Sequence, residues 1–457
     1  MNKITLLCLL VSISCVTVSA QKVLTRRQAQ VDISFFFDQA EQIHPDLYRH
    51  ISKGEMRKRI EEVIEELPNR ISDGDLSVRL RLLVNSIEDG HTNVSVASSL
   101  SDQFRSGNTM LPFTISYSKG GIKIRSSDVV QLHPGDRLLA LNRISVSDFA
   151  QLMGFPYVDI PSQRAARTAE NFSYYFFLKY RIQDSINVRV LRGDKVVQIV
   201  VPMSRYMKKT AIRKYHYHVE ENGVGVLSLD AFWGIEEKKY RRFLDSVFTS
   251  IQRHPIKRLL VDVSRNGGGN SYYGAILLPY LNVTNYRFNQ KYLIKTSGPE
   301  KKYIRKHFIK WYMYPLAVFS KIGRILLFKP NGAITDLHPK DEKLPSSALA
   351  YKGPVYVLTS NATYSAAADF VSAFQYAQRG LLVGEATGQP YSGFIDKIPF
   401  VLPNSKLHAG VSFKAYEYIG CNASNRYNGI LPDLPVDLQN FPSRKGWYKA
   451  VLSRIQE

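Results

Sequence analysis

Apolar residues recur every three or four positions between residues 23 and 87, a spacing that places them on one face of a helix. Three stripes carry the pattern: Ile33, Phe36, Phe37 and Ala40; Ile60, Val63, Ile64 and Leu67; and Leu76, Leu80, Leu83, Val84 and Ile87. Pro68 ends the second stripe, because proline does not continue a helix. The third stripe runs into the polar turn Asp89-Gly90-His91-Thr92. We expect an N-terminal helical region over residues 21–100 that ends in this turn.

The hydrophobic pattern then changes to the alternation typical of strands. Ile122-Lys123-Ile124 alternates, and residues 188–201 predict two strands around the turn Arg192-Gly193-Asp194, with a helix beginning near Asp148 between them. The stretch PGDRLLALNRISV, residues 134–146, resembles the corresponding part of a PDZ domain, a module that captures peptide tails by adding a strand to its sheet. Residues 105–205 therefore predict a PDZ-like β-domain, with a generic small β-domain as the alternative.

From about residue 211 strands and helices alternate. Strands are expected over residues 224–229, 256–263, 355–358 and 381–383, and helices over 235–253, from 271, and over 365–378. This order is typical of a largely parallel sheet covered by helices. Residues 211–445 predict an α/β catalytic domain, so the whole chain is expected to combine this domain with the helical region and the β-domain.

Length and composition fit this division into units. A chain of 457 residues exceeds one ordinary domain, and 44% hydrophobic with 22% charged residues is typical of a globular protein. The formal net charge of +22 favours anionic partners. The sequence contains no recognisable nucleic-acid-binding module, so nucleic acid is not a predicted partner.

Residues 301–329 contain eight Lys or Arg, no acidic residue and many aromatic side chains, including Tyr303, Phe308, Trp311 and Tyr312. One interpretation is an amphipathic element that associates with an anionic membrane surface. The favoured interpretation is a helical insertion whose charges face water and whose aromatic side chains pack on the domain.

Residues 1–20 have the features of an export signal. Lys3 precedes an apolar run over residues 4–11, and Val18-Ser19-Ala20 provides small residues before a cleavage point. The protein is therefore expected to be exported, either periplasmic or secreted. A lipid anchor at Cys15 is less favoured, because Ser12 lies where an aliphatic residue would be expected. Cleavage leaves Cys421 alone, so no internal disulfide is expected.

Three segments of the predicted catalytic domain contain residues that could take part in catalysis or bind an anion. Asp262–Gly269 ends a strand in three successive glycines, whose amides suit an oxyanion hole or an anion nest. Ser365 opens a helix, where free amides favour negative charge, although an ordinary N-cap would have the same pattern. The third segment, residues 382–388, is a strand that ends in a polar glycine turn.

In this order, the three segments resemble the DlRxNxGG, SAsE and GexT blocks of the tail-specific, or C-terminal-processing, serine peptidases. The resemblance extends from about His91 to Pro432 and includes the PDZ-like insert. It implies a ClpP/crotonase-like catalytic core, with Ser365 as nucleophile. It also implies an oxyanion hole formed by the amides of Ala366 and Gly268, with Gly267 as the alternative to Gly268.

Departures from the family pattern suggest which branch the chain resembles. The lysine of the processing branch would fall at Pro390 or Gln389, neither of which can act as a base. The tricorn-like branch uses a histidine from an upstream turn, and Asp89-Gly90-His91-Thr92 resembles that turn. His91 is therefore the candidate general base, with a helix-capping role as the alternative.

The residue that would orient His91 is not identified by the sequence. Arg426 stands where the tricorn-like branch has a glutamate, and Asn425, Asn428 and Glu417 are possible substitutes. The family's DlR arginine is replaced by Ser264. No metal-ligand spacing is visible, and no cofactor is predicted.

We expect an exported serine endopeptidase that hydrolyses unfolded or tail-exposed polypeptides. The alternatives are a catalytically silent relative that binds peptides or apolar ligands at the cell envelope, and an adaptor held at the envelope by its basic surface. The sequence does not indicate an oligomeric state.

Overall fold

The computed structural model describes residues 21–118, 121–207, 213–309, 311–438, 441 and 443–456. The predicted export signal lies outside these residues. Within them the chain forms a mixed α/β structure, as the sequence predicts, but its C-terminal half contains a second large sheet beside the predicted one. None of the helices in the described ranges combines the length and apolar character needed to cross a membrane.

The central sheet has the strand order β12-β13-β14-β19-β20-β23. Only β12 runs antiparallel to its neighbour, so the sheet is largely parallel, as expected. Its strands are β12 (Tyr215–Val219), β13 (Val224–Leu229), β14 (Arg258–Asp262), β19 (Val355–Thr359), β20 (Leu381–Gly384) and β23 (Leu434–Pro435). The helices around it are α7 (Glu237–Arg253), α8 (Tyr272–Leu277), the 3₁₀ turn η3 (Leu278–Leu281), α12 (Ala366–Tyr376) and α13 (Arg444–Gln456).

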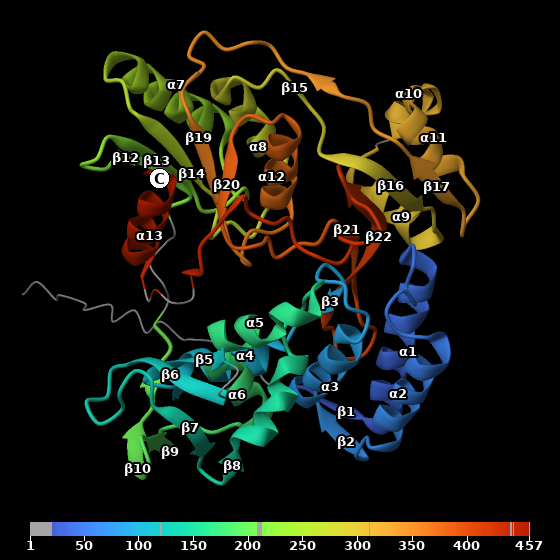
Figure 1. The fold of residues 1–457 in the computed structure, drawn as a ribbon. Coiled ribbons are helices and arrows are strands. Elements are labelled where there is room, and N and C mark those ends of the chain that lie inside the picture. The colour runs from blue at the N-terminus through green and yellow to red at the C-terminus, as the bar shows by residue number, and fades with distance from the viewer. Residues whose placement is uncertain are drawn as a thin grey trace, which may run out of the picture.

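Helices cover both faces of the central sheet (Figure 1). Alternate residues of each strand point to opposite faces. Leu227, Leu259 and Val261 join a core with α7, α8 and α12, whereas Val226 and Leu260 join a second core with α13. All six residues of β13 are buried, as expected for a strand covered on both faces.

A second, antiparallel sheet has the order β17-β16-β22-β21, and β3 pairs with β22. Its strands are β3 (Asn93–Val94), β16 (Asn289–Lys295), β17 (Ile334–Leu337), β21 (Ser392–Val401) and β22 (His408–Tyr418), and β15 (Asn285–Tyr286) pairs with β18 (Glu342–Lys343) nearby. The N-terminal elements are β1 (Val23–Thr25), α1 (Arg26–Ile43), α2 (Lys53–Glu65), β2 (Arg70–Ser72) and α3 (Asp73–Asn85). Their apolar faces share one core with Ile398 and Val411 of the second sheet. The N-terminal region is therefore fixed to the C-terminal half of the chain.

The β-domain forms a separate sheet of order β10-β9-β7-β6-β5, with β8 beside β7. Its elements are α4 (Ser98–Ser106), β4 (Asn108–Met110), β5 (Phe113–Ser118), β6 (Gly121–Ser127), β7 (Arg137–Leu141), β8 (Ile144–Ser145), η1 (Val146–Gly154), η2 (Pro161–Gln163), α5 (Arg164–Glu170), α6 (Phe172–Tyr180), β9 (Ser185–Arg192), β10 (Lys195–Pro202) and β11 (Ser204–Arg205). The helix expected near Asp148 is the 3₁₀ segment η1. Strand β5 ends the sheet, and α5 packs beside it.

Residues 298–328 form short helices at an outer corner of the molecule, beyond β16 and β17 (Figure 1). They are α9 (Gly298–His307), η4 (Trp311–Met313), α10 (Tyr314–Phe319) and α11 (Lys321–Phe328). The helical prediction is confirmed, but the expectation that the aromatic side chains pack on the domain is wrong for most of them. Tyr303 is partly buried, whereas Phe308 and Tyr312 are exposed. The physical reason is that only one side of this insertion has a partner surface.

Candidate active site

Ser365 lies at the junction between β19 and α12, in a conformation that few non-glycine residues adopt. Its φ is 54° and its ψ is −128°, and its side chain makes no capping hydrogen bond to α12. The ordinary N-cap interpretation therefore does not describe this serine. A strained backbone held by its surroundings is typical of functional sites. The hydroxyl is left free for another partner at the positive end of a helix dipole.

His91 reaches Ser365 from the other half of the sequence. α3 ends at Asn85, and the following turn continues into β3, which pairs with β22. The turn is fixed by Asp89, whose Oδ1 accepts the His91 backbone N–H at 2.8 Å, and by Thr92, whose Oγ1 accepts the Ser412 N–H at 3.0 Å. These contacts place the imidazole over the start of α12, rather than at the end of α3.

The His91 Nε2 atom lies 3.4 Å from the Ser365 Oγ atom. Both residues remain partly accessible to solvent, so a substrate can reach them. Burial of the ring lowers the pKa of His91 below its usual range, against the opposing effects of Asp89 and Asp396. The imidazole is therefore neutral at pH 7, the state in which Nε2 can accept a proton from a serine hydroxyl.

Tyr364 and Asp159 lie on the other side of the imidazole, and neither was identified as a site residue by the sequence patterns. The Tyr364 ring stacks on His91, with its Oη atom 3.3 Å from His91 Nδ1, and its hydroxyl donates to Asp159. The phenol has one hydrogen, which Asp159 accepts, so a hydrogen bond between the phenol and the imidazole has Nδ1–H as its donor. The Phe394 backbone also hydrogen-bonds the imidazole and acts to raise its pKa. The tautomer with its hydrogen on Nδ1 leaves the lone pair of Nε2 directed at Ser365.

Gly90 makes this close approach possible. A Cβ atom at Gly90 would lie 2.1 Å from the Tyr364 hydroxyl oxygen and 2.7 Å from Asp159 Oδ2. The Gly90 N–H also donates to Asp159 Oδ1 at 3.0 Å. Burial and the neighbouring Asp89 raise the pKa of Asp159 to about 7. Tyr364 stays protonated, because burial and Asp159 raise its pKa well above its ordinary value.

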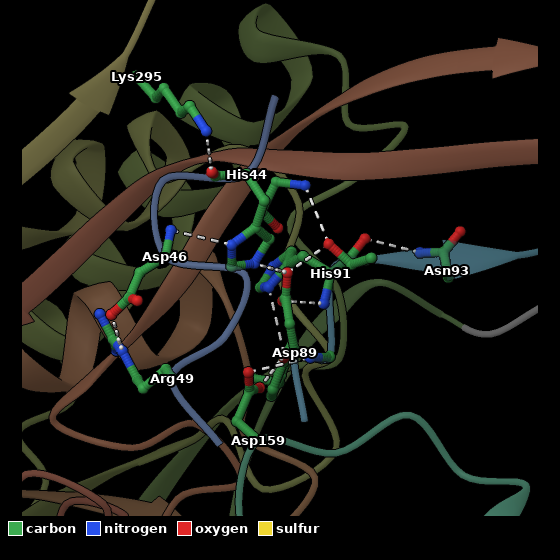
Figure 2. A network of polar contacts seen from close by, with 12 residues as sticks. His44, Asp46, Arg49, Asp89, His91, Asn93, Asp159 and Lys295 are labelled. Carbon is green, nitrogen blue, oxygen red and sulfur yellow. Dashed lines mark hydrogen bonds and ion pairs between the residues drawn. The ribbon is translucent and has the colours of Figure 1, made fainter. Parts of the chain in front are cut away.

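Asp89 links the His91 turn to α1 through His44 (Figure 2). The His44 Nδ1 atom accepts the Asp46 N–H at 3.1 Å, so Nε2 carries the hydrogen and lies 3.2 Å from Asp89 Oδ2. Although burial favours the neutral acid, hydrogen bonds from His44 and Thr92 and the nearby His91 hold the pKa of Asp89 below its usual range. The turn is thus anchored by a buried carboxylate with satisfied partners.

The glycine loop after β14 lies directly against Ser365. A Cβ atom at Gly268 would be 2.5 Å from the Ser365 Cβ atom. In this arrangement the Gly268 N–H donates to Asn266 Oδ1 at 2.9 Å, whereas no hydrogen bond found among the described residues uses the Gly267 N–H. Ala366 begins α12, so its N–H is one of the free amides of a first helical turn.

The positions at which the sequence departs from the family pattern have other partners. The Gln389 Oε1 atom accepts the Ser365 N–H, so Gln389 supports the Ser365 backbone. Arg426 pairs with Glu417 at 2.7 Å. Asn425 and Asn428 donate to the carbonyls of Gly420 and Ser424. The three substitutes considered for orienting His91 are therefore directed elsewhere.

Ser264, which replaces the family's arginine, donates through its hydroxyl to Asp262 Oδ1 at 2.6 Å. The other oxygen of Asp262 accepts from Arg444 of α13 at 2.7 Å and from the Tyr448 hydroxyl at 2.7 Å. Arg444 also pairs with Asp230 at 2.7 Å. An arginine from the C-terminal helix thus lies at the base of the glycine loop. Across the described ranges, no cluster of three or more His, Cys, Asp or Glu side chains is arranged to hold a metal ion.

Residues 223–436 match the sequence model of peptidase family S41. The chain contains a peptidase family S41 domain. This domain is that of a serine-type peptidase, as predicted, and the matched region includes Gly268 and Ser365, whereas His91 precedes it. No curated protein sequence matches the chain.

The fold of the chain was also compared with solved protein structures. A crystal structure of mature CPAF aligns with a TM-score of 0.63 at 13% identity, covering 94% of this chain and 96% of CPAF. A CPAF mutant aligns with a TM-score of 0.66, also at 13% identity, with coverage of 94% and 96%. A photosystem II D1 C-terminal processing protease gives a TM-score of 0.47 at 14% identity, with coverage of 93% and 97%. The chain therefore shares the fold of CPAF over nearly its whole length, including the part that precedes the S41 match.

Proposed function

We propose that this S41 peptidase is an exported endopeptidase of the tricorn-like type, in which Ser365 is the nucleophile and His91 the general base. The observation that carries the proposal is the 3.4 Å approach of His91 Nε2 to the hydroxyl of a strained serine at a helix start. Export rests on the sequence of residues 1–20.

In the proposed reaction, His91 takes the Ser365 proton as the oxygen attacks the peptide carbonyl. The tetrahedral oxyanion is stabilised by the Ala366 N–H and by an amide of the loop at Gly267 or Gly268. His91 then returns the proton to the leaving amine, and an acyl-enzyme remains on Ser365. Water, deprotonated by the same imidazole, hydrolyses the ester and restores the serine.

We assign the orientation of His91 to Tyr364 and Asp159. The phenol accepts a hydrogen bond from Nδ1–H and donates its own to the buried carboxylate of Asp159, which on this proposal replaces the glutamate that the tricorn-like branch has at the position of Arg426. Tyr364 and Asp159 act through His91 and are positioning residues. The hydrogen bond between His91 Nδ1 and Tyr364 Oη is long, at 3.3 Å. Catalytic hydrogen bonds often shorten when substrate binds.

The β-domain supports unfolded or tail-exposed polypeptide as the substrate class. A groove of about 650 Å³ lies at the start of β5, beside the end of β6 and the end of α5, with Phe113, Thr114 and Ala169 among its lining residues. An edge strand beside a helix is the arrangement by which PDZ-type modules add a peptide strand. On this proposal the PDZ-like domain presents chain ends to Ser365.

A fluorophosphonate probe tests the site directly. The full chain is expected to label on Ser365, with labelling abolished in Ser365→Ala and reduced at least about 100-fold in His91→Ala. Ser372→Ala is the matched control, because the Ser372 hydroxyl on the same helix donates to the Phe288 carbonyl instead. Labelling that persists in Ser365→Ala would remove Ser365 from the mechanism.

One observation favours the alternative, a catalytically silent relative that binds peptides. The Gly268 N–H is already engaged by Asn266, so an oxyanion hole that uses this amide requires the Asn266 side chain to turn away. A correctly folded chain that fails to label but binds peptides saturably would support this alternative over the endopeptidase.

A further inference from the structure

The helical insertion at residues 298–329 leaves large apolar side chains exposed to solvent. Leu316 is 72% exposed and Phe319 is 81% exposed, and both lie on α10. The other exposed apolar side chains of the insertion are Phe308, Tyr312, Met313, Val318, Ile322 and Phe328. Single exposed apolar residues are ordinary, but a concentration of this size on one short segment marks a surface that binds something.

The exposed side chains are held in place by a small core of their own. Ile304, Ala317 and Leu327 are buried together, one from each of α9, α10 and α11. The Gly323 position packs against Ala317, where a Cβ atom would lie 2.4 Å from the Ala317 carbonyl oxygen. The insertion is therefore a packed unit with one face turned inward and the other face left uncovered.

The insertion is also strongly basic. The cations among its described residues are Lys301, Lys302, Arg305, Lys306, Lys321, Arg324 and Lys329. None of these seven forms an ion pair with an acidic side chain in the described part of the molecule. Elsewhere on the surface, many cations are paired, as Arg59 is with Glu55 and Lys239 with Glu236. We call these cations and the exposed apolar side chains together the insertion surface.

Charge and apolar groups adjoin one another on the insertion surface. The Arg324 guanidinium donates to the backbone carbonyls of Val318 at 3.0 Å and Phe319 at 3.3 Å, so a cation lies at the base of the most exposed phenylalanine. Lys301, Lys302, Arg305 and Lys306 line a shallow, open hollow on α9. Exposed aromatic side chains and unpaired cations on one short segment match the boundary of an anionic bilayer, where rings enter the acyl region and cations meet the phosphates.

We propose that the insertion surface docks the protein on an anionic lipid membrane. A second copy of the chain is a poor occupant, because a symmetric contact would bring the two sets of unpaired cations together. Docking combines two signals, apolar insertion and charge attraction, which is the combination needed for stable but reversible attachment. The proposal does not depend on catalysis, since the insertion surface contains no residue of the candidate active site.

Vesicle co-sedimentation of the full chain tests the proposal. We expect binding to phosphatidylcholine vesicles that contain phosphatidylglycerol, little binding to phosphatidylcholine alone, and release as salt screens the charges. Lys321→Gln with Lys329→Gln is expected to weaken binding about fivefold for each cation removed. Leu316→Ser with Phe319→Ser is expected to weaken it at least about tenfold.

Matched controls separate the insertion surface from net charge and general hydrophobicity. Lys195→Gln with Lys238→Gln removes the same charge from exposed positions elsewhere, and Val196→Ser with Val200→Ser removes exposed apolar side chains from β10. Circular dichroism verifies that each variant is folded. Equal vesicle binding by the insertion and control variants would overturn the proposal. So would concentration-dependent self-association that Phe319→Ser abolishes, since it would make the surface a protein interface.

Discussion

At the scale of single residues, the central feature is the hydrogen-bond chain from Asp159 through Tyr364 to His91. When Asp159 is ionised, it accepts the hydrogen bond of the Tyr364 phenol. The proposed Nδ1 hydrogen of His91 then points at Tyr364, and Nε2 is free to act as a base. Burial raises the pKa of Asp159 to about 7, and protonation of this carboxyl lets it donate to Tyr364 instead. The phenol hydrogen can then turn toward Nδ1, which places the imidazole hydrogen on Nε2 and switches off the base.

This arrangement predicts two different pH profiles. In the wild type, kcat/KM should fall as pH drops through about 7, because Asp159 becomes protonated. In Tyr364→Phe, which disconnects Asp159, kcat should drop about 10–100-fold at neutral pH. Its remaining acid limb should lie below pH 6.5, because burial lowers the pKa of His91. Peptide hydrolysis measured across pH 5 to 9 provides the comparison.

A purely structural role for Tyr364 would lower the rate without moving the midpoint. Coincident midpoints in the wild type and Tyr364→Phe would therefore contradict the proposed orienting role. Tyr356→Phe is a suitable control, because Tyr356 lies on β19 in the core covered by α13 and does not contact His91.

At the scale of elements, the glycine loop after β14 and the start of α12 are fitted to each other. Gly268 has a φ of +100°, and its Cα lies where a side chain would collide with Ser365 Cβ and with the Tyr364 carbonyl oxygen at 2.7 Å. Glycine is needed here both for its backbone conformation and for close approach.

Gly268→Ala is therefore expected to displace Ser365 and reduce probe labelling at least about tenfold, with a destabilisation on the order of 1–3 kcal/mol. Gly267→Ala is the matched control. A Cβ atom at Gly267 meets nothing within 4 Å, and the substitution keeps the backbone N–H. Equal labelling of the two variants would show that the contact between loop and helix is not what positions the nucleophile.

At the scale of the whole molecule, α13 contacts the base of the glycine loop after β14. Arg444 joins Asp230 and Asp262, and Asp262 is fully buried. The positive charge of Arg444 and the hydroxyl of Tyr448 satisfy a carboxylate that would otherwise be costly to bury.

Removing one partner of this cluster should therefore destabilise the folded protein. Arg444→Ala is expected to lower the free energy of unfolding by about 3–5 kcal/mol, measured by denaturant titration, because it leaves two carboxylates without their cation. Lys449→Ala, an exposed position on the same helix, should change it by no more than about 0.5 kcal/mol. A loss for Arg444→Ala as small as that of the control would mean that water replaces the guanidinium.

Much of the architecture could be predicted from hydrophobic periodicity, because strands such as β13 and helices such as α7 have strong local patterns. The family resemblance singled out His91 and Ser365 as partners across 274 positions, and the structure brings their side chains together. Asp159 and Tyr364 could not be linked in this way, because their contact depends on tertiary packing across 205 positions. The exposed face of α10 was also missed, since a sequence pattern does not show which apolar face finds a partner.

The pairing of β3 with β22 has a consequence for the timing of activity during synthesis. His91 is translated early, and the proposed nucleophile Ser365 follows 274 residues later. The strand that holds the His91 turn, β22, ends only at Tyr418. On the proposed roles, a nascent chain has no complete proteolytic machinery until nearly all of it has been translated. On the proposal of export, the cell that makes the protein therefore holds a complete site only late in the synthesis of each chain.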